Sequence, residues 1–376
     1  MIRIRVSDYH KLRKEYLKYL AETGAAKFDK NDILDIGSGG DDGISQKTYE
    51  ELEKLRGESP WIERIIGYLY DENKRIKRAN LRGLLAGPEE EPYTFSGKGE
   101  KSLLSYFQEI IGRLGDCPDK DDVKKTIKNI FCYDKLKSGK GRELSYWLMR
   151  QIHQETCPYC NIGYTSMVVG KRKSHRAAFD HFFPKSNYPY LSLCLFNLVP
   201  ACNTCNSLKS DDKRTVIYPY EESFDEGEMK CSFRLIPNAG HPEVFATDNY
   251  EFKIQFRFSG TEDYDNWFDI DFNIRKSSLK DKKKWSRIIE SIDTFALEEV
   301  YTQCHKEEIR QFVNNYYVYN EAGVEMILGG IPKYAEDKTT IRNWLFFAFL
   351  NKDEWGTSPL NKLKWDLLEQ LDTIKK

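Results

Sequence analysis

Two Cys-x-x-Cys pairs constrain the fold of this chain more than any other feature of its sequence. They are Cys157-Pro-Tyr-Cys160 and Cys202-Asn-Thr-Cys205, so four soft ligands lie within one short central segment. A Cys-x-x-Cys turn presents two sulfurs to one ion, and zinc favours tetrahedral coordination by four thiolates. We therefore expect the four cysteines to bind one structural Zn²⁺ that holds both ends of the intervening segment together.

The bulk composition limits the kind of protein to which this segment can belong. A chain of 376 residues is too long for one ordinary core, and its 40% hydrophobic content is enough to bury a sizeable one. The sequence has no long apolar run and starts without the apolar stretch of a secretion signal, so we expect a cytoplasmic protein with no membrane partner. With a net charge of −1, the chain cannot coat DNA by bulk attraction, so nucleic-acid binding would need local basic patches.

The spacing of apolar residues predicts an α+β chain that is mainly helical and has three regions. Residues 1–155 are predicted to form a helical N-terminal region, because apolar residues recur there at helical spacing. Residues 156–220 hold the zinc site. Residues 221–376 are predicted to begin with strands at 252–258 and 268–272, which are candidates for pairing, and to continue as helices. The predicted helices are 8–21, 46–56, 61–69, 103–111, 142–155, 285–303, 306–318, 339–351 and 359–374.

The segment between the cysteine pairs is predicted to fold as strand, strand and helix. Residues 165–169 are predicted to be a strand, and a turn is predicted over 170–174. The second strand is expected over 175–183. A loop with two prolines then leads to residues 197–201, and a helix begins near Cys202. The result would be a small unit whose two ends are joined by one zinc ion.

This segment resembles the HNH endonucleases, whose core is a ββα-metal finger. The shared pattern is Asp-His, then Asn-Leu, then Cys-x-x-Cys-Asn-x-x-Lys. It occurs here as Asp180-His181, Asn197-Leu198 and Cys202-Asn-Thr-Cys205-Asn206-Ser-Leu-Lys209. The third position of the family motif, often His, is Asn206 here, a substitution that is common in the family. The match covers the central segment only, with the zinc cysteines flanking it.

The resemblance implies an enzyme that hydrolyses DNA phosphodiester bonds with the help of a divalent ion. His181 would be the general base, because an imidazole removes a proton readily near neutral pH. Asp180 and Asn206 would bind Mg²⁺ or Mn²⁺ together with water and the scissile phosphate. Asn197 would hold the strand and the ring of His181 in place.

Basic residues near the motif would neutralise the flanking phosphates of DNA. The candidates are Lys171, Arg172, Lys173, Arg176, Lys185 and Lys209. His175, six residues before His181, is expected to be a surface residue of a strand, with DNA contact as the alternative.

Simpler interpretations compete with a nuclease. In an inert zinc module that binds nucleic acid, His181 would be a core histidine and the motif asparagines would be turn and cap residues. Residues 157–160 alone also spell a redox Cys-Pro-Tyr-Cys, and residues 33–40 resemble a methyltransferase glycine motif. Those two motifs require neighbouring strands, whereas the surrounding pattern predicts helices. A metal site and a turn between helices are therefore preferred.

The outer regions resemble, more loosely, the larger HNH proteins that act with an ATPase in anti-phage systems of the Septu kind. The shared features are the chain length, the central finger, Tyr218-Pro-Tyr220 and Ser358-Pro-Leu-Asn-Lys-Leu363. This resemblance implies a nuclease effector of prokaryotic antiviral defence, with DNA as substrate and an ATPase as partner that residues 221–376 would dock. The apolar rows of 285–303 and 359–374 are docking candidates, although such rows more often form a core. A stand-alone restriction-type nuclease is the alternative.

Overall fold

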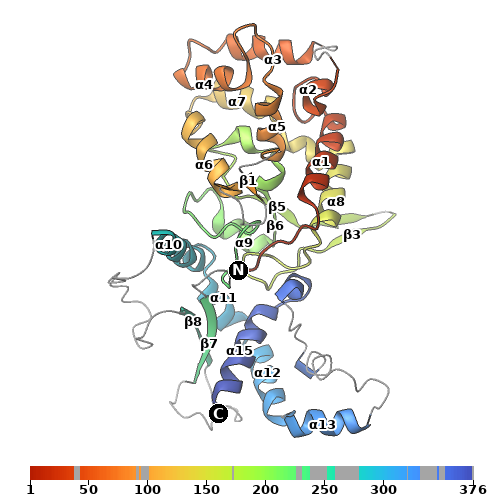
Figure 1. The fold of residues 1–376 in the computed structure, drawn as a ribbon, viewed down its shortest axis with the longest axis vertical. Coiled ribbons are helices and arrows are strands. Elements are labelled where there is room, and N and C mark those ends of the chain that lie inside the picture. The colour runs from red at the N-terminus through yellow and green to blue at the C-terminus, as the bar shows by residue number, and fades with distance from the viewer. Residues whose placement is uncertain are drawn as a thin grey trace. The chain divides into compact units, whose positions relative to one another are not determined.

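The computed structural model describes residues 1–37, 43–89, 93–94, 101–171, 173–225, 231–237, 252–258, 279–319, 321–330, 345–346 and 352–374. Within these residues the chain is mainly helical with short strands, as predicted (Figure 1). None of the helices in these ranges is long and apolar enough to cross a membrane.

The chain forms two compact units. The N-terminal unit comprises Ile4–Gln154 and Thr165–Lys213, and the C-terminal unit comprises Met1–Arg3, Glu155–Tyr164 and Arg214–Lys376. The division into regions 1–155, 156–220 and 221–376 stays a prediction, and the boundaries of the two units cut across its central region.

Helices build most of the N-terminal unit. They are α1 (Tyr9–Thr23), α2 (Lys30–Leu34), α3 (Ile44–Glu53), α4 (Pro60–Leu69), α5 (Arg78–Ala86), α6 (Leu103–Leu114), α7 (Asp121–Ile130), the 3₁₀ helix η1 (Tyr133–Lys137) and α8 (Gly139–Ile152). The cap of α1 is Asp8, whose carboxylate accepts a hydrogen bond from the Lys11 amide at 2.9 Å, so the helix begins one residue later than the predicted range of 8–21. Helix α3 begins at Ile44, two residues before the predicted range of 46–56, so Ser45 lies inside its first turn.

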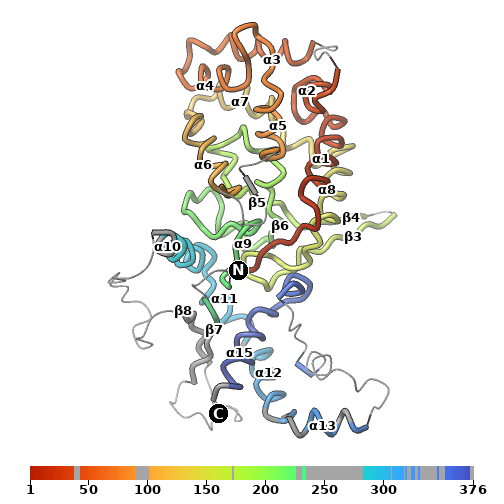
Figure 2. Tube along the Cα trace, in the orientation of Figure 1, coloured from red at the N-terminus to blue at the C-terminus, as the bar shows by residue number. Residues whose placement is uncertain are grey.

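Amphipathic faces give this unit its core. Helix α6 buries Leu103, Phe107, Ile110 and Leu114, which recur at the spacing of one helix face. Helices α4 and α8 bury similar apolar faces, and α8 runs beside α1 (Figure 2). The glycine motif at 33–40 begins inside α2 rather than after a strand, although residues 38–42 lie outside the described ranges. A methyltransferase glycine motif requires a strand before it, and the described residues before this motif form no such strand.

The strands of the N-terminal unit correct the prediction for the central segment. Strands β3 (Met167–Val169) and β4 (Ser174–Arg176) form the predicted hairpin, but the second strand stops at Arg176. The chain resumes as β5 (Ala178–His181), which pairs antiparallel with β6 (Leu198–Ala201). Helix α9 (Asn203–Lys209) follows and contacts β5. The strand, strand, helix unit is thus β5–β6–α9, and a long loop joins its two strands.

Short elements complete the N-terminal unit. Strands β1 (Tyr93–Thr94) and β2 (Lys101–Ser102) pair in parallel. The loop between β5 and β6 contains two 3₁₀ turns, η2 (Pro189–Leu191) and η3 (Leu195–Asn197). Residues 189–201 are buried throughout, so this loop is part of the core rather than a surface excursion. Its burial restricts the position of the residues that end β5.

In the C-terminal unit, a strand pair accompanies a set of helices. Strand β8 (Phe252–Phe258) lies where alternation predicted it, but it pairs antiparallel with β7 (Cys231–Pro237). The partner considered at 268–272 lies outside the described residues. The helical elements are α10 (Leu279–Thr294), α11 (Leu297–Cys304), α12 (Lys306–Val318), α13 (Glu321–Gly330), η6 (Lys352–Thr357) and α15 (Asn361–Ile374).

Two predicted helices of this unit differ from the observed ones. The helix expected over 285–303 is divided between α10 and α11, because Ala296 adopts a left-handed backbone with φ of 45°. The helix expected over 359–374 begins only at Asn361. The helix expected over 339–351 lies almost entirely outside the described residues. The apolar rows on α10 and α15 are buried, so their main members serve the core: Trp285, Ile288, Ile292, Leu360, Leu363, Leu367 and Leu371.

Candidate metal and catalytic site

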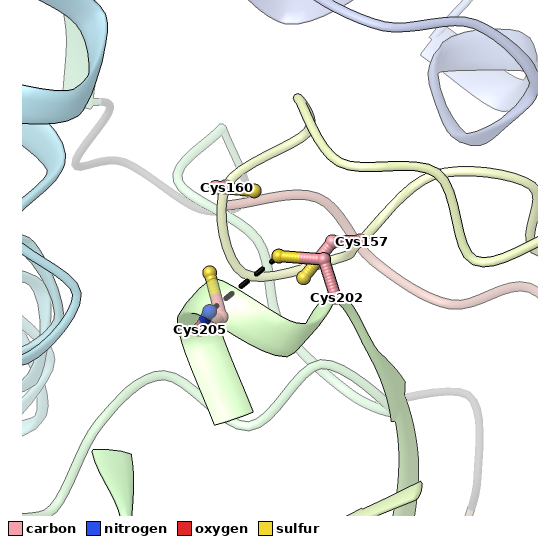
Figure 3. Close-up of side chains that lie close together, drawn as sticks. All are labelled: Cys157, Cys160, Cys202 and Cys205. Carbon is pink, nitrogen blue, oxygen red and sulfur yellow. Dashed lines mark hydrogen bonds between the residues drawn. The ribbon is translucent and has the colours of Figure 1, made fainter. Parts of the chain in front are cut away.

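Four cysteine side chains gather at one point (Figure 3). The sulfurs of Cys157, Cys160, Cys202 and Cys205 all lie within 4.8 Å of one another. Four thiolates around one zinc ion at 2.3 Å would be about 3.8 Å apart, so a small inward movement of the sulfurs completes the coordination. Cys202 is half-buried and the other three are buried. The predicted cluster is confirmed, and it can hold a metal ion such as zinc.

Backbone geometry prepares these sulfurs for a metal. The Ile162 amide donates to Cys160 Sγ at 3.4 Å, and the Cys205 amide donates to Cys202 Sγ at 3.5 Å (Figure 3). Such N–H donors stabilise thiolates and orient them as ligands. The Asn161 amide closes the first turn by donating to Cys157 O at 2.7 Å.

The remaining five cysteines lie outside the cluster and differ in exposure. Cys117, Cys194 and Cys231 are buried, but Cys132 is half-buried and Cys304 is exposed. The nine cysteines all fall within the described ranges and form no disulfide.

His181 is the last residue of β5 and is only 7% exposed. Its Nε2 lies 3.0 Å from the backbone oxygen of Ser192, in the loop between β5 and β6. A carbonyl can only accept, so Nε2 carries the proton and the neutral ring keeps Nδ1 as an acceptor. Ser192 is itself held, because its hydroxyl donates to Phe131 O at 2.8 Å. The fold therefore sets one tautomer of His181.

Burial also sets the charge of this ring. The pKa of His181 falls from 6.5 to about 3, chiefly because burial disfavours the imidazolium. The hydrogen bond to the Ser192 carbonyl opposes this change, and the positive charges of Lys185, Lys209 and Lys137 add to it. His181 is thus a neutral imidazole over the physiological pH range.

Asn197 ties the loop to the end of β5. Its side chain is fully buried. Nδ2 donates to Phe183 O at 3.1 Å and to Leu191 O at 3.0 Å, while Oδ1 accepts from the Phe183 amide at 2.7 Å. Phe183 is two residues after His181, and Leu191 precedes the Ser192 carbonyl that receives the imidazole proton. The Asn197 amide group therefore holds both the end of the strand that carries His181 and the loop that carries the Ser192 carbonyl.

Asp180 and Lys209 form a buried ion pair. The Lys209 ammonium lies 3.2 Å from Oδ1 and 3.1 Å from Oδ2 of Asp180, and it donates to His181 O at 2.7 Å. The two side chains are only 2% and 4% exposed. Lys209 was expected to meet a DNA phosphate, but in this structure its charge is engaged by the carboxylate beneath it. Its position on the last turn of α9 accounts for this, because that turn packs on β5.

Asn206 lies one turn before Lys209 on α9 and is half-buried. Residues three apart project from the same helix face. Because Lys209 reaches Asp180 from that face, Asn206 lies on the side of α9 that contacts β5. The ββα unit thus brings Asp180, His181 and Asn206 to neighbouring positions on β5 and α9, although they are up to 26 residues apart in the chain.

The other predicted phosphate-binding residues divide by exposure. Lys171, Lys173 and Lys185 are exposed, and Arg172 lies outside the described residues. Arg176 is half-buried: it donates to Ala177 O at 2.8 Å and its guanidinium lies 4.8 Å from the centre of the Phe179 ring. His175 is exposed on β4, which was the expected placement.

Two contacts of His181 come from outside the predicted motif. Ser192 supplies the carbonyl described above. Tyr133, in η1, places its ring edge-on to the imidazole, with the ring centres 4.5 Å apart. No spacing rule connects residue 133 with residue 181, and the contribution of Ser192 is a backbone atom that sequence patterns do not mark. Neither residue carries a signal that would have identified it.

Comparisons with models of protein families, with curated proteins and with solved structures found no match to this chain. The residues and geometry of the site are therefore the basis on which a function can be proposed for this chain.

Proposed function

We propose that this chain is a metal-dependent endonuclease that hydrolyses DNA phosphodiester bonds, with β5–β6–α9 as an HNH-type ββα-metal finger. One observation carries the proposal: His181 Nε2 lies 3.0 Å from Ser192 O. This contact leaves Nδ1 of a neutral imidazole as a proton acceptor, next in the chain to the Asp180 carboxylate. A buried N–H of any histidine needs an acceptor, so it is the free Nδ1 in the motif of Asp180, Asn197 and Asn206 that favours a general base over a core histidine.

The residues would share the reaction as follows. Phosphodiester hydrolysis needs an activated water and stabilisation of the charge that develops on the phosphate oxygens. His181 Nδ1 takes a proton from the attacking water, and the Nε2–H bond to Ser192 O steadies the ring as it gains charge. Asn197 keeps that carbonyl in place through its bonds to Leu191 and Phe183.

Asp180 and Asn206 would hold the divalent ion. Both carboxylate oxygens of Asp180 pair with the Lys209 ammonium, so an ion bound here would have to share the carboxylate with Lys209 or displace its ammonium. Two oxygen ligands that leave room for water and phosphate suit Mg²⁺ or Mn²⁺. When bound, such an ion supplies Lewis-acid stabilisation of the phosphate.

The four-cysteine cluster is proposed to hold a structural Zn²⁺. Elemental analysis of the purified chain should then find one zinc per chain, and Cys202→Ser should lose that zinc and melt at a lower temperature. Purified chain without bound zinc would reject this assignment.

The nuclease proposal is tested by nicking of supercoiled plasmid. Cleavage should require Mg²⁺ or Mn²⁺ and stop in chelator. His181→Ala should lower the rate by about 10²–10⁴, the usual contribution of a general base. His175→Ala is the matched control, because this exposed histidine on β4 should leave the rate unchanged. Equal rates for His181→Ala and the wild type, or full activity in chelator, would reject the mechanism and favour a zinc module that binds nucleic acid.

The proposal also includes a role in prokaryotic antiviral defence with an ATPase partner, which depends on the looser resemblance of the outer regions. Coexpression with a candidate ATPase followed by size-exclusion chromatography should give one complex. Separate elution, with full activity of the isolated chain, would favour the stand-alone restriction-type nuclease.

A further inference from the structure

The short helix η1 lies against the candidate base although it is far from the motif in sequence. The ring of Tyr133 meets the imidazole of His181 at an interplanar angle of 74°, with 4.5 Å between ring centres. This edge-to-face contact is a favoured aromatic geometry and limits rotation of both rings. Burial raises the pKa of the Tyr133 hydroxyl, and the positive charge of Arg176 on β4 opposes this change. Tyr133 therefore contacts His181, the candidate general base, and lies near the positive charge of Arg176.

Two lysines lie over the same tyrosine ring. Lys185 Nζ is 5.1 Å and Lys137 Nζ is 5.9 Å from the ring centre. Both lysines are exposed, unlike Lys209, whose ammonium is buried on Asp180. A cation over an aromatic ring keeps its charge in a defined place while it stays open to solvent. The fold thus gathers accessible positive charge beside His181.

One carboxylate lies within this group. Asp134 is 2.5 Å from Lys137, with side chains that are 75% and 59% exposed. Exposed ion pairs of this kind are weak, so a phosphate can replace the carboxylate at little cost. The positive charges of Lys185 and Lys128 also act on Asp134, so the surroundings stay basic.

We propose that Tyr133, Lys137, Arg176 and Lys185 form the surface that receives the polynucleotide backbone, and that Tyr133 positions His181 against the scissile phosphate. This inference rests on the proposed nuclease function. We name these four residues the Tyr133 surface. A polynucleotide carries one phosphate per nucleotide, so the phosphates next to the scissile one fall within reach of the side chains around His181. Lys137 and Lys185 would neutralise them, while Arg176 adds its positive charge from β4, where it is held by Ala177 O and the Phe179 ring.

Binding is measured first, on the full chain in chelator so that no cleavage occurs. The probe is a fluorescein-labelled DNA duplex, followed by fluorescence anisotropy at several salt concentrations. Lys137→Gln/Lys185→Gln should raise Kd roughly tenfold and lower the slope of log K against log salt by about 2, one per lost phosphate contact. Lys47→Gln/Lys54→Gln is the matched control: it removes the same charge from exposed positions at α3 and should leave Kd and slope near the wild-type values.

Cleavage then separates binding from positioning. The double lysine variant should raise KM with little change in kcat. Tyr133→Leu should lower kcat at least tenfold, because a displaced general base loses much of its effect. Tyr133→Phe keeps the ring contact and should retain kcat within about threefold. A merely structural tyrosine would instead give leucine and phenylalanine variants whose kcat follows their melting temperatures.

The outcomes distinguish this inference from the proposed function. If the wild type cleaves DNA but Lys137→Gln/Lys185→Gln matches the control variant in Kd and slope, the Tyr133 surface is rejected and the nuclease stands. If the wild type binds DNA through these lysines but never cleaves it, the nuclease is rejected and the binding surface stands. If the wild type neither binds nor cleaves, both are overturned.

Discussion

Among the described residues, each compact unit buries a lysine–aspartate arrangement, and the two differ in what surrounds them. Lys209, in the N-terminal unit, pairs with Asp180 at 3.1 Å. Lys362, in the C-terminal unit, is fully buried and pairs with Asp225 at 2.9 Å and Asp366 at 2.7 Å. By burial and pairing alone, Lys362 would be the stronger candidate for a functional residue.

The residues around each ion pair favour Lys209 and Asp180 instead as the candidates for a functional site. Asp366 also accepts the Phe233 amide at 2.8 Å, and the Lys362 ammonium lies 5.8 Å and 5.4 Å from the ring centres of Phe233 and Trp355. These contacts tie α15 to β7 and η6 and leave the group enclosed in its unit. Asp180 instead adjoins a histidine of fixed tautomer, with exposed lysines nearby. A buried ion pair therefore indicates a catalytic site only through its neighbours.

The largest expected effect is at Lys362. Lys362→Met leaves Asp225 and Asp366 buried without their cation, which should lower the free energy of unfolding by about 3–5 kcal/mol. Urea unfolding followed by circular dichroism measures the change. Lys364→Met, two residues further along α15 and half-buried, should cost far less. Equal losses for the two variants would mean that the Lys362 pairs do not stabilise the unit.

Lys209→Met sharpens the comparison, because under the proposed function a metal ion would replace the lost charge at Asp180 and not at Asp225 and Asp366. In chelator the variant should lose about 3 kcal/mol of unfolding free energy, since Asp180 is left unpaired. Mn²⁺ should then restore part of this loss by binding the folded site. The same Mn²⁺ should not restore Lys362→Met. A lack of metal rescue at Lys209→Met would argue against Asp180 as a metal ligand.

The smallest expected effect is a pH dependence of stability that belongs to His181. Its pKa is lowered in the fold from 6.5 to about 3, so protonation favours the unfolded chain. The free energy of unfolding should not depend on the protonation of His181 above pH 6.5, and it should decrease as the pH falls from 6.5 towards 3. In urea unfolding at several pH values, His181→Asn should flatten this decline relative to the wild type. His175→Asn should leave it unchanged, and an equally steep decline in His181→Asn would contradict the assignment.

Local patterns predicted the parts of the site that depend on residue type and spacing. The four-cysteine cluster could be predicted because two Cys-x-x-Cys pairs at this spacing are typical of a metal site. Strand β8 could be predicted from the alternation of apolar and polar residues. The pairing of β5 with β6 was missed because the intervening loop carries no signal of which strand will be the partner. The burial of Lys209 was missed because lysines are ordinarily exposed. Tyr133 reaches His181 only through tertiary packing.

The hydrogen bond from His181 to Ser192 has a consequence for the order of events during synthesis. A ribosome adds residue 181 before the carbonyl that sets its tautomer, and before Asn197, which holds that carbonyl. The helix that carries Asn206 follows later still. A nascent chain that has emerged only as far as β5 therefore has an imidazole with no defined proton arrangement. Under the proposed function, nuclease activity appears only after the loop between β5 and β6 has folded and α9 has packed on β5. An incomplete nascent chain would therefore not cleave the DNA of the cell.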